Sequence, residues 1–562
     1  MRASRALRLN ISHGPYFDTG AKAAKSLAVE IGNAIGTVNQ PRDPLASHCE
    51  VVNLELCTTA ADLLAPSLQQ FKGCHIIDAN PGAGLWSSTI NNLLRPKRHV
   101  LVEDDARFDP FIDRLLQSDP SYSRVRYDGS HSQSLERVVD EGLVPRPGPS
   151  SDPSKPSTSL LVLINLTRGM SMFGGSAVRQ KVRRRERTTD LCREAWLRFG
   201  IQKDGPVRIL AWVEEGTKDA LVPRTVTGTS SSIAAQRYAN HMHVVAEDYS
   251  HTTRADATSK PEWESTWEAL KRMEAAGLQI PANRQNPLHK TLLRLGEDWP
   301  RTWERFMNTM RKDLDQLDIP VGNKARHPPR RTIAPLLQEG DEVMRLERLA
   351  VDDSQPKEVR LAAREEYEKR YAELHRAVTS LASARRLHFN QDMDRQALWR
   401  RDPPGSLWDR RPFEPVECRK KDFCTILGRP LSLLDICPKG PAQKHSPFDL
   451  LYWERLVSKL LERSAQPLSN AFDMISPGAS ELIMPKLSVL RDPLRYGSLH
   501  PEHVRARMLT IEMLEELVQV WKSWPSRPRH IEDEVLKIET SWISSYTDHK
   551  PDSRPGLKPC TP

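Results

Sequence analysis

Three acidic residues lie at or directly after the ends of apolar segments that are typical of parallel β-strands. Asp78 lies near the end of "CHIIDA", Glu103 ends "HVLVE", and Asp128 follows "RVRY". The carboxyl ends of parallel strands meet in one crevice, where sheets of this kind bind nucleotide-like ligands. Glu103 is therefore placed to bind ribose hydroxyls and Asp128 to reach an adenine amine, unless all three are ordinary loop acids.

The first of these strands leads into a glycine turn, "DANPGAGLW". Gly82 and Gly84 let the backbone approach a ligand, and the N-terminus of the helix that follows favours polar groups. The turn lacks the G-x-G-x-x-G spacing, which favours S-adenosylmethionine over NAD as the cofactor. Asn80 stands where a glycine is expected. Because asparagine tolerates left-handed backbone, we expect the turn to survive, with a side chain that crowds the cofactor.

The fourth strand ends in "INLTRG", residues 164–169. An N6-adenine methyltransferase flips its target base out of the stack, holds the amine with an asparagine and a proline carbonyl, and stacks the base on an aromatic ring. Asn165 fits the first of these roles, but Thr167 and Arg168 replace the proline and the aromatic. Base stacking is worth about 1–3 kcal/mol, so its loss argues against methyl transfer. An arginine suits a phosphate or a stacked single strand instead.

A basic run, "KVRRRER", follows at residues 181–187. It is either a solvated helix face or a surface that contacts the nucleic-acid backbone, and the net charge of +9 with a pI near 9.1 suits the second interpretation. We assign nucleic-acid binding to Arg168, Lys181, Arg183, Arg184, Arg185 and Arg187, and cofactor binding to Asp78, Asn80, Gly82, Gly84, Glu103, Asp128 and Asn165. The eight cysteines form no CxxC pair and no zinc spacing, so we expect reduced thiols and no metal site.

The elements that must position these residues alternate along the first half of the chain. Helical patterns separate six apolar segments, which we expect to be strands at 74–79, 99–103, 124–127, 159–165, 207–213 and 243–247. Such a βαβ series predicts an α/β fold with a doubly wound, largely parallel sheet. A Pro/Ser/Gly-rich loop at 142–158 is expected to be disordered.

The second half of the chain is mostly helical. The sequence of residues 250–411 predicts a charged helical insertion with a long helix from about 357 to 400. This insertion either packs on itself or reaches a partner. Its apolar seam consists of Tyr367, Tyr371, Leu374, Val378 and Leu381. Residues 412–445 hold the last strand or strands of the sheet and a connection, 446–545 a helical C-terminal domain, and 546–562 a tail. No run of 18 apolar residues occurs, so we expect no membrane span.

The first 28 residues are basic and poor in acids. Arg2, Arg5 and Arg8 alternate with alanine, serine and leucine, and Asp18 is the single acid. This composition is typical of a mitochondrial presequence, and a basic disordered start is the alternative. We expect mitochondrial import, with residues 1–28 as the presequence and 29–249 as the sheet domain.

Several segments together resemble the rRNA adenine N6-dimethyltransferase superfamily, and more narrowly its fungal mitochondrial transcription factor B branch. They are "IIDANPGAGLWSSTI", "HVLVEDDARF", "VRYDGS", "LINLTRG", the helix and fifth strand at 190–213, the closing strand "PFEPVECRK" at 412–420, and two C-terminal segments at 467–483 and 518–528. The resemblance covers about residues 30–250 and 412–545. It implies a class I methyltransferase-like sheet domain followed by a helical C-terminal domain.

The resemblance also implies a function. A member of this branch is a mitochondrial transcription initiation factor of the matrix nucleoid, with mitochondrial RNA polymerase and melted promoter DNA as partners. The alternative is a mitochondrial small-subunit rRNA adenine dimethyltransferase, with S-adenosylmethionine as donor and Asn165 orienting the amine. A third interpretation is a ribosome-associated RNA-binding protein with an inactive site. The replacement of proline and aromatic by Thr167 and Arg168 favours the transcription factor.

Overall fold

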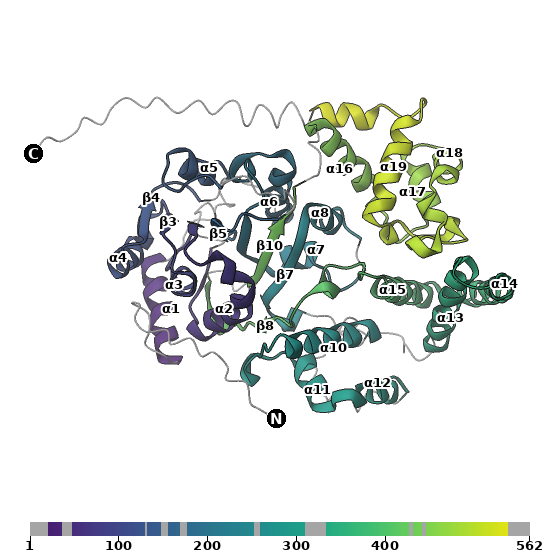
Figure 1. Ribbon diagram of the computed structural model, residues 1–562, viewed down its shortest axis with the longest axis horizontal. Coiled ribbons are helices and arrows are strands. Elements are labelled where there is room, and N and C mark those ends of the chain that lie inside the picture. The colour runs from purple at the N-terminus through teal and green to yellow at the C-terminus, as the bar shows by residue number, and fades with distance from the viewer. Residues whose placement is uncertain are drawn as a thin grey trace, which may run out of the picture.

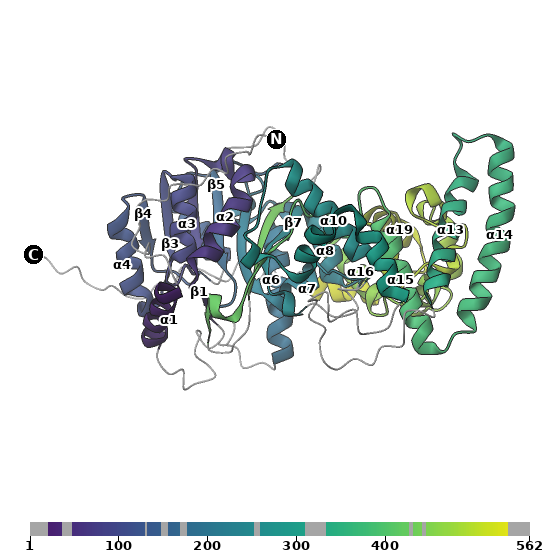
Figure 2. The ribbon, with the colours of Figure 1, turned by 90° about the horizontal axis from the view of Figure 1, so that it is seen from below.

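The computed structural model describes residues 21–35, 48–129, 132–147, 155–168, 177–226, 228–251, 259–308, 333–425, 431–440 and 446–537. The molecule is elongated (Figure 1, Figure 2). The sheet and its helices form one end, and the helices of the insertion form the other, beside the C-terminal domain.

A mixed, mostly parallel sheet of eight strands forms the centre of the fold, in the order β4-β3-β2-β5-β6-β10-β7-β8. Its strands are β2 (His75–Ala79), β3 (Arg98–Val102), β4 (Tyr122–Val125), β5 (Leu160–Asn165), β6 (Arg208–Glu214), β7 (Ala239–Glu247), β8 (Val416–Glu417) and β10 (Leu431–Pro438). The first six in chain order correspond to the six predicted strands, so that part of the prediction is confirmed.

The strand expected at 412–420 is only the two-residue strand β8, at the edge of the sheet beside β7. The longer strand of this region is β10, which runs antiparallel between β6 and β7. All eight residues of β10 are buried, because helices cover both faces of the sheet. The position of β10 between two strands that precede it in the chain was not predicted.

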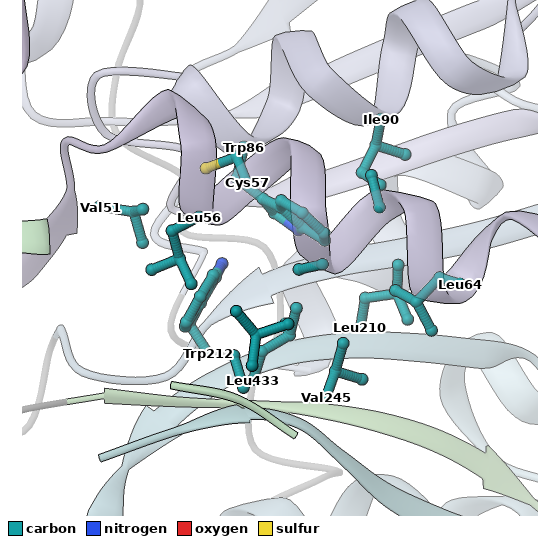
Figure 3. Packing of buried hydrophobic residues seen from close by; sticks show 14 of the residues in the cluster. Val51, Leu56, Cys57, Leu64, Trp86, Ile90, Leu210, Trp212, Val245 and Leu433 are labelled. Carbon is teal, nitrogen blue, oxygen red and sulfur yellow. The ribbon is translucent and has the colours of Figure 1, made fainter. Parts of the chain in front are cut away.

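Each face of the sheet carries a separate apolar core. One face is covered by α1 (Ala21–Ile35), α2 (Leu54–Leu68), α3 (Leu85–Leu94), α4 (Asp109–Ser118), α10 (Lys260–Ala275) and α11 (Pro287–Leu295). The other is covered by α5 (Ser132–Asp140), α6 (Ala177–Leu197), α7 (Glu215–Leu221) and α8 (Ser230–Tyr238). Figure 3 shows the first core, where Leu56 and Leu64 of α2 lie over Leu210, Trp212 and Leu433 of the sheet. The fold is therefore a three-layer sandwich.

The predicted presequence overlaps with α1. Residues 1–20 lie outside the described residues, but 21–28 belong to the helix, and Leu27 is buried together with Ile31 and Ile35. The predicted boundary at residue 28 therefore falls within an element that packs on the sheet domain. Of the loop expected to be disordered at 142–158, residues 148–154 lie outside the described part.

The insertion contains α12 (Trp299–Asn308), α13 (Ala334–Val351), α14 (Lys357–Thr379) and α15 (Ser383–Trp399) in addition to α10 and α11. The prediction of a single helix from 357 to 400 is wrong, because residues 380–382 separate two helices, α14 and α15. Helices α13 and α14 pack on each other around a small core that includes Val343, Leu346 and Tyr367. This favours an insertion that packs on itself.

Buried ion pairs also attach the insertion to the sheet domain. Glu262 of α10 is 1% exposed and accepts hydrogen bonds from Arg224 (2.7 Å) and from the Trp408 indole (3.0 Å). The Arg224 guanidinium lies 4.0 Å from the centre of the Trp408 ring. Because these groups come from three parts of the chain, the insertion is part of the folded core.

The C-terminal domain has its own core around Trp453, Phe472 and Trp521. Its helices are α16 (Pro447–Leu461), α17 (Leu468–Ile475), α18 (Ala479–Ile483) and α19 (Ile511–Ser523). Glu454 of α16 accepts hydrogen bonds from Arg193 (2.9 Å) and Tyr238 (2.7 Å) of the sheet domain. Among the described helices, none is long and apolar enough to cross a membrane.

We expect Glu262→Ala to lower the free energy of unfolding by about 1–3 kcal/mol, because the buried Trp408 indole N–H and one Arg224 N–H then lack their acceptor, while Arg224 keeps its pair with Glu247. The urea transition of tryptophan fluorescence measures this loss. The control is Glu268→Ala on the same helix, whose ion pair with Lys271 is half exposed and should contribute less than about 1 kcal/mol. Equal shifts in the two variants would contradict a structural role for the buried pair.

Candidate functional site

A short strand of the chain itself lies across the carboxyl edge of the sheet. This strand, β1 (Cys49–Val51), pairs antiparallel with β9 (Phe423–Thr425). The Asn165 amide donates to the Cys49 carbonyl (2.9 Å), and the Cys49 N–H donates to the Thr167 hydroxyl (3.2 Å). The strand therefore covers the side chain of Asn165, which is buried.

The other polar atom of the Asn165 side chain is also engaged. Its carbonyl oxygen accepts from the Thr167 N–H (3.1 Å) and from the Thr167 hydroxyl (2.6 Å), and the residue is 8% exposed. A base amine would have to displace these bonds before it could reach the asparagine. In this structure Asn165 joins β5 to β1.

The glycine turn keeps the backbone that the sequence predicts. Gly82, Gly84 and Asn80 all have positive φ, at 56°, 75° and 56° respectively, so the expectation that asparagine adopts the left-handed region is confirmed. The Asn80 side chain is buried, and its amide donates to the backbone carbonyl of Asn165 (3.2 Å). It therefore joins the ends of β2 and β5.

The carboxylate of Glu50, from β1, lies directly against this turn. It accepts from the Ala83 N–H (3.2 Å) and from His48 (2.6 Å). A Cβ atom at Gly82 would lie only 1.6 Å from a Glu50 oxygen, so the glycine is needed for this close approach. An N–H of the turn is thus occupied by an acidic side chain of the same chain.

Little space remains between these groups. The cavity at the carboxyl edge has a volume of about 20 Å³ and is lined by residues that include Glu50, Asp78, Asn80, Asn165 and Trp212. This is room for about one water molecule and far less than a nucleoside needs. Figure 3 shows Val51, Trp86 and Trp212 packed in the apolar core beside it.

Arg168 is buried among carboxylates. It is 4% exposed, forms a short ion pair with Glu103, and lies 2.9 Å from Asp104. Burial raises the pKa of the Glu103 carboxyl, and the Arg168 guanidinium opposes that shift. Glu103, the expected ribose ligand, and Arg168, the expected nucleic-acid contact, thus bind each other, and neither side chain reaches an external ligand while this pair is intact.

The remaining predicted residues are divided between the carboxyl edge and helix α6. Asp78 is buried and lies 3.2 Å from His99. Asp128 is half buried near Arg187, which donates to the Gly129 carbonyl (3.1 Å) and whose pKa burial lowers to about 10. The basic residues from position 181 to 185 lie in α6, but their side chains are outside the described part.

The sequence analysis missed the residues that close the site. His48, Cys49 and Glu50 precede the glycine turn by some 30 positions, and only the acid within the β-like "CEVV" hints at a special role. Buried hydrogen bonds hold the ends of β2 and β5, the glycine turn and strand β1 together.

We expect Arg168→Met to lower the free energy of unfolding by about 3–5 kcal/mol at neutral pH, because Glu103 then stays buried without its cation. Since burial already raises the folded pKa of Glu103, its ionisation opposes folding. The loss is therefore largest well above that pKa and shrinks as the pH falls toward it. Urea unfolding at several pH values measures it. Arg107→Met, which removes a more exposed partner of Asp105, should cost less than about 1 kcal/mol.

Comparisons with known proteins add no relative to this picture. No family model and no curated protein matches the chain.

Proposed function

We propose that this protein is a non-enzymatic mitochondrial transcription initiation factor, which binds mitochondrial RNA polymerase and promoter DNA on a methyltransferase-like fold. The observation that carries the proposal is that two of the predicted site residues bind other groups of the same chain. Asn165 is bound to the backbone of Cys49, and Arg168, at the position of the stacking aromatic, is paired with Glu103. Because both side chains already bind groups of the chain, neither is available to a flipped adenine, which supports a binding role for the fold.

The sheet supports the resemblance on which this proposal rests. Strands β4, β3, β2, β5 and β6 are parallel and follow the doubly wound order with β2 in the middle. The antiparallel strand β10 between β6 and β7 is compatible with a class I methyltransferase-like sheet. A helical domain follows, as in the family that the sequence resembles.

The nucleic-acid surface of the proposal is the basic run on α6. Because Arg168 and Arg187 both have partners within the chain, we assign contact with the DNA backbone to Lys181, Arg183, Arg184 and Arg185. The net charge of +9 favours an anionic partner. The basic N-terminal segment supports mitochondrial import.

One observation favours the second candidate, a small-subunit rRNA adenine dimethyltransferase. The turn at Gly82 and Gly84 keeps the left-handed backbone of a cofactor site, so displacement of β1 would bring back a space for S-adenosylmethionine. Such a reaction would require Glu50 to leave the turn and Asn165 to leave Cys49.

A run-off assay with the cognate polymerase on a mitochondrial promoter tests the proposal. We expect specific transcripts only when this protein is present, and equal stimulation by Asn165→Ala, because that side chain bonds to the chain itself and not to substrate. In parallel, labelled S-adenosylmethionine with small-subunit rRNA should give no transfer of label.

The outcomes separate the candidates. Equal initiation by polymerase alone would rule out the transcription factor. Label on rRNA adenines that Asn165→Ala abolishes would establish the methyltransferase. Tight rRNA binding without either activity would indicate the ribosome-associated protein.

Charge reversal of Arg183, Arg184 and Arg185 to glutamate should weaken binding to promoter DNA. The slope of log K against log salt should fall by about 0.9 for each DNA phosphate that the variant no longer neutralises, measured by fluorescence anisotropy. The matched control reverses three exposed cations of α14, Lys357, Arg364 and Lys369. Unchanged isotherms in the first variant, or equally weakened binding in both, would show that the α6 run is only a solvated face.

A further inference from the structure

A turn of the C-terminal domain brings two imidazoles and a carboxylate together. His500, Glu502 and His503 flank or form the short turn Pro501–His503, and each offers a ligand atom within 4.8 Å of the other two. The Nδ1 atoms of His500 and His503 lie 3.2 Å and 4.0 Å from the same Glu502 oxygen. Ligands of a tetrahedral zinc ion with bonds of about 2.0–2.1 Å are separated by roughly 3.3 Å. Small movements bring this set to a metal once the Tyr371 hydroxyl, which bonds to Nδ1 of His503, has turned away.

Helix α14 supplies the groups that orient the first histidine. The Nε2 atom of His500 lies 3.3 Å from a Glu368 carboxylate oxygen, and its ring stacks on Tyr371 with centroids 4.2 Å apart. A histidine that binds a metal through one nitrogen usually donates its other N–H to a carboxylate, which fixes the ring. His500 already has this arrangement, with Nδ1 directed to Glu502 and Nε2 to Glu368.

We propose that His500, Glu502 and His503 bind Zn²⁺ or a similar divalent transition metal, with Glu368 as a positioning residue. Two imidazoles and one carboxylate are a donor set that zinc uses, with a fourth position left for water. Magnesium and calcium prefer oxygen ligands and should not bind. This proposal departs from the expectation, drawn from the cysteine spacing, that the chain has no metal site.

A metal here stabilises the junction between the insertion and the C-terminal domain. The site lies beside a cavity of about 270 Å³ between α13, α14, α15 and the segment around residues 493–508. Glu347 of α13 already joins the two parts, because it accepts from Tyr367 of α14 (3.0 Å) and from Ser498 (2.7 Å). The proposed ion sits where α14 meets the same segment.

A second cluster of ligand types, His241, His243 and Asp435, is a useful contrast. Both oxygens of Asp435 already accept from Arg208, at 2.8 Å and 2.7 Å. A metal there would have to displace this guanidinium and would lie beside its fixed positive charge. We therefore expect no binding at His241 and His243, and a variant there serves as a control.

The test is Zn²⁺ titration of the untagged, chelator-treated full-length protein by calorimetry, with Mg²⁺ as a negative control and Co²⁺ absorption as a report of nitrogen ligation. We expect about one ion per chain and a thermal midpoint that rises with Zn²⁺ concentration. His500→Ala and Glu502→Gln should abolish binding. Glu368→Gln should weaken binding about 10–100-fold, an effect that a merely structural glutamate would not have on metal affinity.

His530→Ala, at an exposed histidine of the same domain, and His243→Asn should bind Zn²⁺ as the unmodified protein does. Absence of binding by the unmodified protein would overturn the proposal. Stoichiometric binding that survives both His500→Ala and Glu502→Gln, or that His243→Asn abolishes, would overturn it as well. The unliganded thermal midpoint of each variant verifies that it is folded, and Glu368→Gln tests the site without removing a ligand.

Discussion

Polar groups buried at the carboxyl edge of a parallel sheet need hydrogen-bond partners, because an unmade bond in the interior costs about 1–3 kcal/mol. In this protein the chain supplies those partners itself. Strand β1 provides the backbone of Cys49 for Asn165 and the carboxylate of Glu50 for the glycine turn. The Arg168 guanidinium likewise donates to one oxygen of the Glu103 carboxylate. The closed edge of the sheet follows from these interactions.

These contacts give the cofactor-type turn a structural role within the chain. Gly82 is required because the Glu50 carboxylate approaches the backbone there, and Asn80 because its amide reaches the β5 end. Residues that a catalytic fold would need for a ligand thus have a structural role in this chain. The nucleic-acid binding that we propose is assigned to the basic run of α6.

The insertion is held to the rest of the molecule by charge as well as by apolar packing. Glu262 lies between Arg224 and Trp408 in the core, and Asp394 of α15 accepts from Arg505 (2.6 Å) and Arg507 (2.7 Å) of the C-terminal segment. Ion pairs buried at this depth add little net stability but strongly penalise misplacement of either partner. The position of α14 beside the histidine turn, which the proposed metal site uses, is supported by Glu347 of α13, which accepts from both Tyr367 of α14 and Ser498.

Local patterns in the sequence were sufficient to predict the strands of the sheet domain. The six strands from 74–79 to 243–247 follow from apolar runs, and the left-handed backbone of Asn80 from its neighbours in the turn, because both depend on short-range sterics and periodicity. Only the tertiary structure decided that β10 enters between β6 and β7, and that the helix from 357 to 400 divides. These outcomes depend on which surfaces meet.

The same division holds for the candidate site. The sequence by itself identified Asn165 and Arg168 as the residues that decide the chemistry, because their types stand at the end of a recognisable strand. It offered no means to pair Arg168 with Glu103, 65 positions away, or to bring Cys49 onto Asn165, 116 positions away. Contacts at such separations are set by the packing of the whole sheet and leave no periodic signal in the chain. The tertiary structure alone therefore decided that these side chains bind partners within the chain.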